Sequence, residues 1–491
     1  MAAVAGSPSM NDVWFCATRG RLADVRSLLQ QFSSADRLKL PAALALRGVE
    51  NALNGDVRGG VSVLRRAADR SSGVEKQYIT DLAVPYAVSV GELDVAESLL
   101  EGAGEIIGAL RPMFLASRAV LATRKGFDDE SRAIARSARE ALDENDDPMV
   151  ACRTLQRIGL AAYFREDYDE AQERSLEAAR AFESIGAFRG ATNAYSVLFV
   201  IAQNWLANPI IARNYASRIA DLAARDGDQA MHNYGLVLQY ELAAESGDVR
   251  RFGSIRARLL ANPMQEQFRE RFSFVFSDSL SHGWSKQFTL CRKAMQSVQQ
   301  KRDILDTERI MSDAIIALCD VAQWDIEAVR MRAHSVLQRT VQRHGVAALY
   351  DTQTRRNARV LAAAALIITG EQTRGRRALG RNIDPDGYFA KLDPLIGLAI
   401  DRAAPMMRGY AMFINAVCEA AVDTRPKHAL TKAEFEVLQA LASGLTRREL
   451  AAELGKTENT VMKQMSAIYT KLDVSSRAQA VRQARELGIL S

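Results

Sequence analysis

The sequence predicts an all-α protein in which a long array of helix pairs, an α-solenoid, is followed by a small four-helix domain. Three observations support this prediction. The 491 residues are 48% hydrophobic, 25% charged and only 7% aromatic, and no alternating run of Val, Ile and Thr is long enough for a strand. A short turn signal recurs along most of the chain. A cluster of helix-capping signals lies near the C-terminus.

The segment that precedes the array, residues 1–10, is expected to lack fixed structure. It has no charged leader followed by a long apolar core, as a secretory signal would. No stretch approaches 18 apolar residues, so we expect no contact with a membrane. The 5 cysteines are scattered and suit a reducing cytoplasm. Neither they nor the 5 histidines show the spacing of a metal site, and we expect no metal and no cofactor.

The array is predicted over residues 11–421 from turn signals about 35 to 47 residues apart. A helix, a turn and a second helix fill one such interval, and the pair can bury its apolar faces only when copies stack. The alternative is a set of unrelated helical hairpins that produce this period by accident. The signals begin at Gly20, Gly55, Gly91, Gly126, Glu166, Ala207, Gly247, Gly283, Gln323 and Gly370.

One copy of the repeat, Leu155 to Ala178, resembles the tetratricopeptide repeat. The small Gly159 and Ala171 would let its two helices approach closely, and Tyr168 would lie between neighbouring pairs. Most other copies keep only the turn and a small residue, so the array is described as tetratricopeptide-like. The matching positions are Leu155, Ile158, Gly159, Tyr168, Ala171 and Ala178.

Two groups of side chains in the array have more than one interpretation. Residues 352–381 hold seven arginines and one acid, Glu371, which favours a solvated helical face over a surface for DNA phosphate or for the C-terminal domain. Six aromatic residues could line a ligand groove, although helical spacing favours the core. The arginines are Arg355, Arg356, Arg359, Arg374, Arg376, Arg377 and Arg381, and the aromatic residues are Trp205, Trp284, Trp324, Tyr163, Tyr234 and Tyr240.

A polar linker is expected over residues 422–428, after a last array helix at Met406 to Ala421 and before a domain at residues 429–491. In this domain three capping boxes predict where helices begin, and two glycines predict where the first two helices end. The boxes are Thr431 with Glu434, Thr446 with Glu449, and Ser476 with Gln479, and the glycines are Gly444 and Gly455.

The third helix of this domain is predicted from Thr457 to Leu472, with one apolar and one polar face. Val461, Met465, Ile468 and Leu472 form a single apolar stripe that must pack on the first two helices. The opposite side carries Asn459, Lys463, Ser466 and Thr470. A short helix, a tight turn and a long helix with an exposed polar face form a helix-turn-helix, whose exposed helix fits a DNA major groove.

The domain also resembles the LuxR-type DNA-binding domains over about 60 residues. The resemblance lies in Leu430 to Leu438, Gly444 to Ala451, Thr460-Val461 and Lys471 to Arg477. The chain departs from the family at Ala433 and Lys456, and it has Thr460-Val461-Met462-Lys463-Gln464 where the family usually has Thr-Val-Lys-x-His.

The resemblance implies double-stranded DNA as a partner and assigns roles to single residues. Base-reading positions match Met462, Lys463 and Ser466, and the polar face adds Asn459. Positions near phosphates match Thr446, Arg447, Thr460, Gln464 and Lys471. The family uses its last helix to pair two copies on DNA, which implies a homodimer through Ala480, Val481, Ala484 and Leu487.

These patterns predict a cytoplasmic, sequence-specific DNA-binding transcription regulator, with RNA polymerase as a further partner. Its repeats would sense a ligand, peptide or partner protein and control the DNA reader. Gly455-Lys456-Thr457 is no phosphate-binding loop, because no strand or further glycines precede it, and no Gly-x-Ser-x-Gly turn is present, so we expect no enzyme. The alternative is a protein-interaction scaffold whose C-terminal helices only oligomerise.

Overall fold

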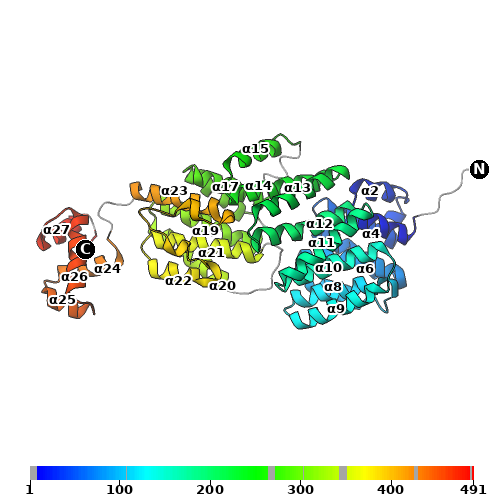
Figure 1. Ribbon diagram of the computed structural model, residues 1–491, viewed down its shortest axis with the longest axis horizontal. Helices are drawn as coiled ribbons and strands as arrows, with labels where there is room; N and C mark the ends of the chain where they lie inside the picture. The colour runs from blue at the N-terminus through cyan, green and yellow to red at the C-terminus, as the bar shows by residue number, and fades with distance from the viewer. Residues whose placement is uncertain are drawn as a thin grey trace, which may run out of the picture.

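A computed structural model describes residues 8–106, 108–263, 271–301, 304–341, 351–424, 430–486 and 489–490. These residues form helices and no strand, apart from one isolated bridge between Asp393 and Gly397. Most of the helices stack into an elongated array, and the last four form a small separate group (Figure 1). The predicted fold, a tetratricopeptide-like α-solenoid followed by a four-helix domain, is confirmed.

Helix pairs are the unit of the array. The first five pairs are α1 Met10–Arg19 with α2 Leu22–Gln30, α4 Pro41–Leu53 with α5 Val57–Asp69, α6 Gly73–Ser89 with α7 Leu93–Glu101, α8 Arg111–Arg124 with α9 Asp128–Asp143, and α10 Pro148–Phe164 with α11 Tyr168–Ser184. The next five are α12 Phe188–Asn204 with α13 Pro209–Arg225, α14 Gln229–Glu245 with α15 Val249–Leu260, α17 Phe272–Trp284 with α18 Phe288–Gln299, α19 Asp306–Ala322 with α20 Ile326–Val341, and α21 Asp351–Ile368 with α22 Gln372–Ile383. The described part of the array also contains the short α3 Asp36–Lys39, the 3₁₀ turns η1 Gly108–Leu110, η2 Phe389–Lys391, η3 Ile400–Arg402 and η4 Pro405–Met407, and the helix α23 Arg408–Thr424.

Each predicted turn signal lies at the junction within one of these pairs. Most junctions contain a left-handed residue, which a glycine adopts without strain, as at Gly55 (φ 99°) and Gly370 (φ 101°). Among the glycines that begin these signals, Gly283 is the one that is not left-handed. It lies inside α17, where an added Cβ would be 2.4 Å from the ring of Phe413, and the left-handed residue of that turn is Lys286 (φ 57°). Gly283 is therefore required by packing rather than by the turn.

The α10 and α11 pair has the packing that its resemblance predicts. A Cβ added at Gly159 would lie 3.0 Å from the backbone nitrogen of Ser175, so only a glycine permits this approach of the two helices. The ring of Tyr168 stacks on Trp205, at the end of the next helix, with ring centroids 4.7 Å apart. Trp205 is thus a contact between pairs and is 58% exposed, whereas Tyr240 is fully buried.

Among the described residues, two large hydrophobic cores fill the array, beside a small cluster of Ala162, Ala171, Val197 and Ile201, and α14 contributes to both large cores. Leu238 and Leu242 pack into the core of the first half, and Val237 and Tyr240 pack into the core of the second half. A third, smaller core lies within the C-terminal domain. Because α14 is apolar on both sides, it joins the two halves of the array into one packed body.

Both ends of the array differ slightly from the predicted boundaries. Ser9 already caps α1, in a reciprocal box with Asp12, so structure begins inside the segment expected to lack it. The last helix, α23, runs to Thr424 and takes up the start of the predicted linker. The rest of that linker, residues 425–428, lies outside the described residues, as do residues 1–7. Within the described part of the chain, no helix is long and apolar enough to cross a membrane.

Candidate nucleic-acid interface

Four helices form the C-terminal domain: α24 Lys432–Ala442, α25 Arg447–Glu453, α26 Glu458–Leu472 and α27 Arg477–Glu486. The capping boxes at the start of α24 and α25 are both complete. The hydroxyl of Thr431 accepts the backbone N–H of Glu434, whose carboxylate accepts the N–H of Thr431, and Thr446 and Glu449 repeat this arrangement. Two of the three predicted boxes are confirmed, and each fixes the first turn of its helix.

The third box is built differently. The side chain of Gln479 accepts the backbone N–H of Ser475 at 3.0 Å, one residue before the predicted cap, while Ser476 Oγ accepts the N–H of Gln479 at 3.4 Å. The long helix α26 has a cap of its own, because Thr457 Oγ1 accepts the N–H of Thr460 at 3.2 Å. All four helices therefore start at residues with side-chain oxygen acceptors nearby.

The turns around α25 set the angle between it and the neighbouring helices. Gly444 and Gly455 both have positive φ, 85° and 60°, as their predicted positions after helix ends require. Asp473 ends α26 in the same left-handed conformation (φ 53°). This end of the helix was not predicted from a glycine, because none follows Leu472 directly. An aspartate tolerates this region better than most residues because its short side chain can hydrogen-bond locally.

One face of α26 is buried as predicted. Val461 and Ile468 are fully buried and Leu472 is 5% exposed. They pack with Met465 in a core whose other members come from α24, α25 and α27. This burial fixes the rotation of α26 about its own axis, and so decides which side chains point away from the domain.

The opposite face of α26 is open to solvent. Asn459, Lys463, Ser466 and Thr470 are all exposed, and Met462 beside them is 47% exposed. The structure therefore places the residues predicted to read bases on one accessible side of one helix. Their contact with bases remains a prediction.

The residues predicted near phosphates lie around this face in different environments. Thr446, Arg447 and Thr460 are exposed at helix starts, where backbone N–H groups favour anions. Gln464 is partly buried and accepts a hydrogen bond from Lys456 Nζ at 3.3 Å. Lys456 is one of the departures from the family pattern, and its ammonium group also lies 3.7 Å from Glu436.

Lys471 has an intramolecular partner that the sequence pattern did not indicate. Its Nζ donates to Oε2 of Glu434 on α24 at 2.5 Å. Burial alone would raise the pKa of Glu434, but the bonds from Lys471 and Thr431 outweigh it and hold that pKa below its ordinary value. The charge of Lys471 is thus already compensated inside the domain, which weakens the case for it as a phosphate contact.

A structural role that sequence reasoning missed belongs to Arg477, at the start of α27. Its guanidinium donates to the backbone carbonyls of Leu441 and Leu445, at the end of α24 and in the following turn. Carbonyls at a helix C-terminus have no partner in their own helix, and a cation is a favourable one. The signal was the basic residue in the matched run Lys471 to Arg477, but only the fold shows which carbonyls it meets.

The predicted dimer surface on α27 requires a correction. Ala480 and Ala484 are fully buried in the core of their own domain, and Val481 is partly buried against it. Leu487 lies outside the described residues. The exposed side of α27 carries Ala478, Gln479, Arg482 and Arg485 instead. The error arose because small and aliphatic residues at helical spacing fit the inside of a small domain as well as an interface.

The arginines of residues 352–381 divide into two groups. Arg356 and Arg359 donate to the carbonyls of Ile383 and Ala378, and Arg355 pairs with Asp306 at 3.2 Å, so these three stabilise the array. The arginines on α22 are exposed to solvent: Arg374, Arg376, Arg377 and Arg381. Only this second group fits the solvated face that the sequence favoured.

Comparison with known proteins places the C-terminal domain in a family. The family described as bacterial regulatory proteins, luxR family, matches residues 428–484. Transcriptional regulatory protein YdfI of Bacillus subtilis is 44% identical over 62 residues, which are 13% of this chain and 29% of that protein. Probable HTH-type transcriptional regulator GfsR of Streptomyces halstedii is 48% identical over 59 residues, 12% of this chain and 24% of GfsR. The chain thus spans about a quarter of the length of these two relatives.

A third relative is little more than the domain itself. Spore germination protein GerE of Bacillus subtilis is 41% identical over 64 residues, which are 13% of this chain but 86% of GerE. The matched segment contains all of α24, α25 and α26 and most of α27. Through this domain, the chain belongs to the luxR family of bacterial regulatory proteins.

Proposed function

We propose that this protein is a sequence-specific DNA-binding transcription regulator in the cytoplasm. In this proposal α26 enters the major groove of double-stranded DNA, and its exposed face reads bases through Asn459, Met462, Lys463 and Ser466. The observation that carries the proposal is the division of α26 into a buried apolar side and an open polar side. Its relatives YdfI and GfsR are named as transcriptional regulators, which supports the same reading.

Phosphate contacts are assigned to exposed side chains near the groove face whose charges are not already paired within the domain. Arg447 and Lys463 are exposed near the groove face, whereas Lys471 is paired with Glu434. We assign phosphate binding to Arg447, Thr446 and Thr460, with Gln464 positioned by Lys456. A homodimer on DNA would use the exposed side of α27, and RNA polymerase would be the further partner.

The helical repeats are the sensing part in this proposal. A ligand, peptide or partner protein that binds the array in one of two arrangements would shift the population toward that arrangement. The shift reaches the DNA reader through α23, the last array helix before the C-terminal domain. This assigns the two parts of the chain to one mechanism and predicts no enzymatic step.

The test uses the full chain and a matched pair of lysine variants. Fragments of genomic DNA that the wild-type protein binds are selected first, and gel-shift titrations with a shared fragment follow. Lys463→Ala should weaken binding by about tenfold or more, since a good base contact is worth roughly 1–3 kcal/mol. Lys293→Ala, which removes an exposed lysine of α18, should bind like the wild type. Equal binding by both variants would refute the placement of the groove face.

Salt dependence separates this proposal from a scaffold that only oligomerises. DNA binding should weaken steeply as salt rises, because counterions are released from the phosphates, and a packed helical oligomer should not respond in this way. The burial of Ala480 and Ala484 within one domain also leaves less apolar surface for such an oligomer.

A further inference from the structure

A cavity of about 400 Å³ lies inside the array, between its two halves. Its walls come from α12, α14, α17, α19, α21 and α23. This volume is within the usual range for sites that hold small organic molecules. We call it the acidic cavity, because Glu241, Glu245 and Glu308 line it.

Glu245 is buried in the wall of this cavity and has three hydrogen-bond donors around it. It is 5% exposed and accepts hydrogen bonds from Tyr410 on α23 and Gln203 on α12. Asn357 on α21 lies 3.5 Å away as a third donor and also donates to the hydroxyl of Tyr410 at 2.9 Å. The carboxylate of Glu245 is therefore held in place by donors from three helices that are far apart in the sequence.

Two residues that line the cavity carry acceptors with no donor among the described residues. Gln203 is 4% exposed, and its Oε1 is buried without a hydrogen bond. The amide is not reversed while Glu245 is ionised, since its oxygen would then face the carboxylate to which its nitrogen now donates. Glu241 lies one helical turn before Glu245 and has no hydrogen bond or ion pair to any described residue. Burial, and then the charge of Glu245, raise the pKa of Glu241 to about 8.

The remaining walls add negative charge and aromatic surface. Glu308 is the third acid, and among the described lining residues the basic one is Arg271, which is exposed. The rings of Phe272 and Phe276 stack with their centroids 5.8 Å apart. The ring of Phe276 also lies near that of Tyr410, with the centroids 6.3 Å apart. A guest that suits this lining must donate hydrogen bonds, carry positive charge and have an apolar body.

We propose that the acidic cavity binds a small organic cation, a primary ammonium compound with an apolar body. The ammonium group would donate to Glu241 and to Oε1 of Gln203, and the body would lie along Phe272 and Phe276. This inference rests on the proposed function, in which the array senses an effector, and it gives that effector a place and a chemical class. Tyr410 belongs to the wall, so the bound cation acts directly on α23, the helix that leads to the DNA reader.

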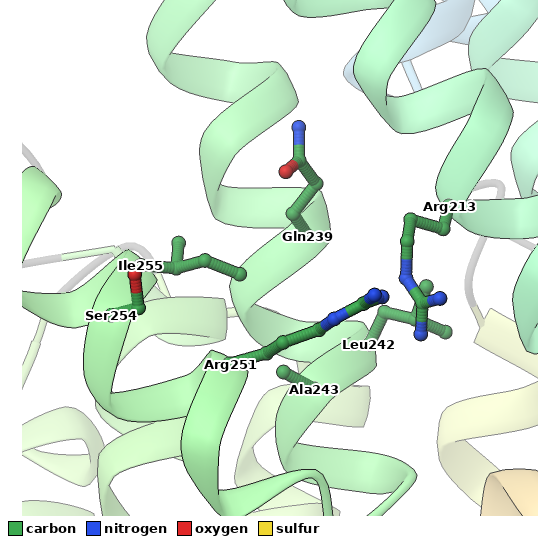
Figure 2. A pocket seen from close by; sticks show the side chains of 7 residues that line it. All are labelled: Arg213, Gln239, Leu242, Ala243, Arg251, Ser254 and Ile255. Atoms are coloured by element: carbon green, nitrogen blue, oxygen red, sulfur yellow. The ribbon is translucent and has the colours of Figure 1, made fainter.

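A second cavity, on another side of α14, has the opposite charge. It measures about 190 Å³, and in Figure 2 its two arginines, Arg213 and Arg251, point toward each other above Leu242. Arg251 is exposed and lies 3.5 Å from Asp248, so its charge is partly compensated at the surface. Two guanidinium groups favour an anion over a cation here, so α14 lies between a basic and an acidic cavity.

Isothermal titration calorimetry on the full chain tests the proposal with tyramine and butylamine as probes, at about pH 8.5, where primary ammonium groups stay charged. 4-Ethylphenol and 1-butanol are the uncharged counterparts. Tyramine or butylamine should bind with one site per chain, and the uncharged counterparts should not. Glu241→Gln should weaken amine binding by about 10- to 100-fold, the loss expected for one charged hydrogen bond. Glu130→Gln, an exposed glutamate on α9, should leave binding unchanged.

Three outcomes overturn the proposal: neither amine binds, the uncharged counterparts bind equally well, or Glu241→Gln binds like Glu130→Gln. Folding is monitored by circular dichroism, and Gln203→Leu, which removes the second acceptor, is a separate variant that should also lose affinity. Gel shifts in the same samples keep the two proposals apart. DNA binding without amine binding refutes only the cation site, and amine binding without DNA binding refutes only the proposed function.

Discussion

The hydroxyl of Tyr410 donates a hydrogen bond of 2.6 Å to Oε1 of Glu245, across 165 residues of sequence. The bond ties α23 to α14, the helix shared by both cores of the array. Next to it, Gly409 lies against the backbone of Ala244, and Trp284 Nε1 donates to the carbonyl of Gly409 at 2.7 Å. The last helix before the DNA reader is thus attached at the wall of the acidic cavity.

Replacing Tyr410 by Phe tests how strongly this bond holds α23. The variant leaves the buried Glu245 carboxylate with one donor fewer, and we expect a loss of about 1–3 kcal/mol in the free energy of unfolding. Urea denaturation followed by circular dichroism measures it. Tyr388→Phe is the control, because its hydroxyl donates to Ala399 at an exposed position and should matter less. Equal losses in the two variants would contradict the special role of Tyr410.

The acidic cavity should make the stability of the array depend on pH. The pKa of Glu241 is raised from 4.5 to about 8, so the folded protein holds this proton more tightly than the unfolded chain does. The contribution of Glu241 to the free energy of unfolding is therefore fully present below about pH 4.5, and it is lost as the pH rises through about 8. Glu245, whose pKa is raised to about 7, adds to the same trend. The other ionisable groups that line the cavity are Glu308, Arg271, Tyr234 and Tyr410.

Glu241→Gln removes one of these titrating groups. As the pH rises from about 5 to about 9, the urea midpoint of Glu241→Gln should fall less than that of the wild type. At the alkaline end of this range the midpoint of the variant should exceed the wild-type value. Glu130→Gln should follow the wild type throughout, because Glu130 is exposed. A wild-type midpoint that rises over this range, or a slope unchanged in Glu241→Gln, would show that Glu241 does not bind its proton more tightly in the folded protein.

Gly409 and Gly253 form a matched pair for the attachment of α23. A Cβ at position 409 would lie 2.0 Å from the carbonyl oxygen of Ala244, whereas nothing lies within 4 Å of one at position 253. Gly409→Ala should cost about 3 kcal/mol or more through overpacking, and Gly253→Ala should be neutral or stabilise α15 by up to about 1 kcal/mol. Thermal unfolding measures both. A harmless Gly409→Ala would mean that α23 does not pack this closely.

Lys471→Ala separates a structural role from phosphate binding. Without this lysine the buried Glu434 loses its cation, and we expect the C-terminal domain to lose about 1–3 kcal/mol. Hydrogen exchange of the α24 and α26 amides in the full chain reports the loss. Because the pKa of Glu434 lies below its ordinary value of 4.5, the stabilisation exists above that pH and disappears as pH falls below it.

The difference between Lys471→Ala and the wild type should therefore shrink in acid. Lys293→Ala, which removes an exposed lysine, should exchange like the wild type at every pH. Unchanged exchange in Lys471→Ala, together with weaker DNA binding, would return Lys471 to the phosphate contacts.

Local signals in the sequence determined most of the helices and where they turn. The turns at Gly55 and Gly370, and the capping boxes at Thr431 and Thr446, satisfy hydrogen bonds within a few residues, so the sequence alone suffices to predict them. The apolar stripe that contains Val461 was equally readable, because a period of 3.6 residues has one structural meaning in a helix. These features sufficed to predict the fold class and which face of α26 is exposed.

Only the tertiary structure decided which partner each side chain meets. The sequence could not distinguish Ala480 as a core residue from Ala480 as an interface residue, nor show that Lys471 is paired with Glu434. It gave no sign that Glu245 and Tyr410 meet across the array, because that contact depends on how many repeats stack between them and at what angle. Periodicity determines which face of a helix is apolar, but burial and pairing are set by what the rest of the chain brings to that face.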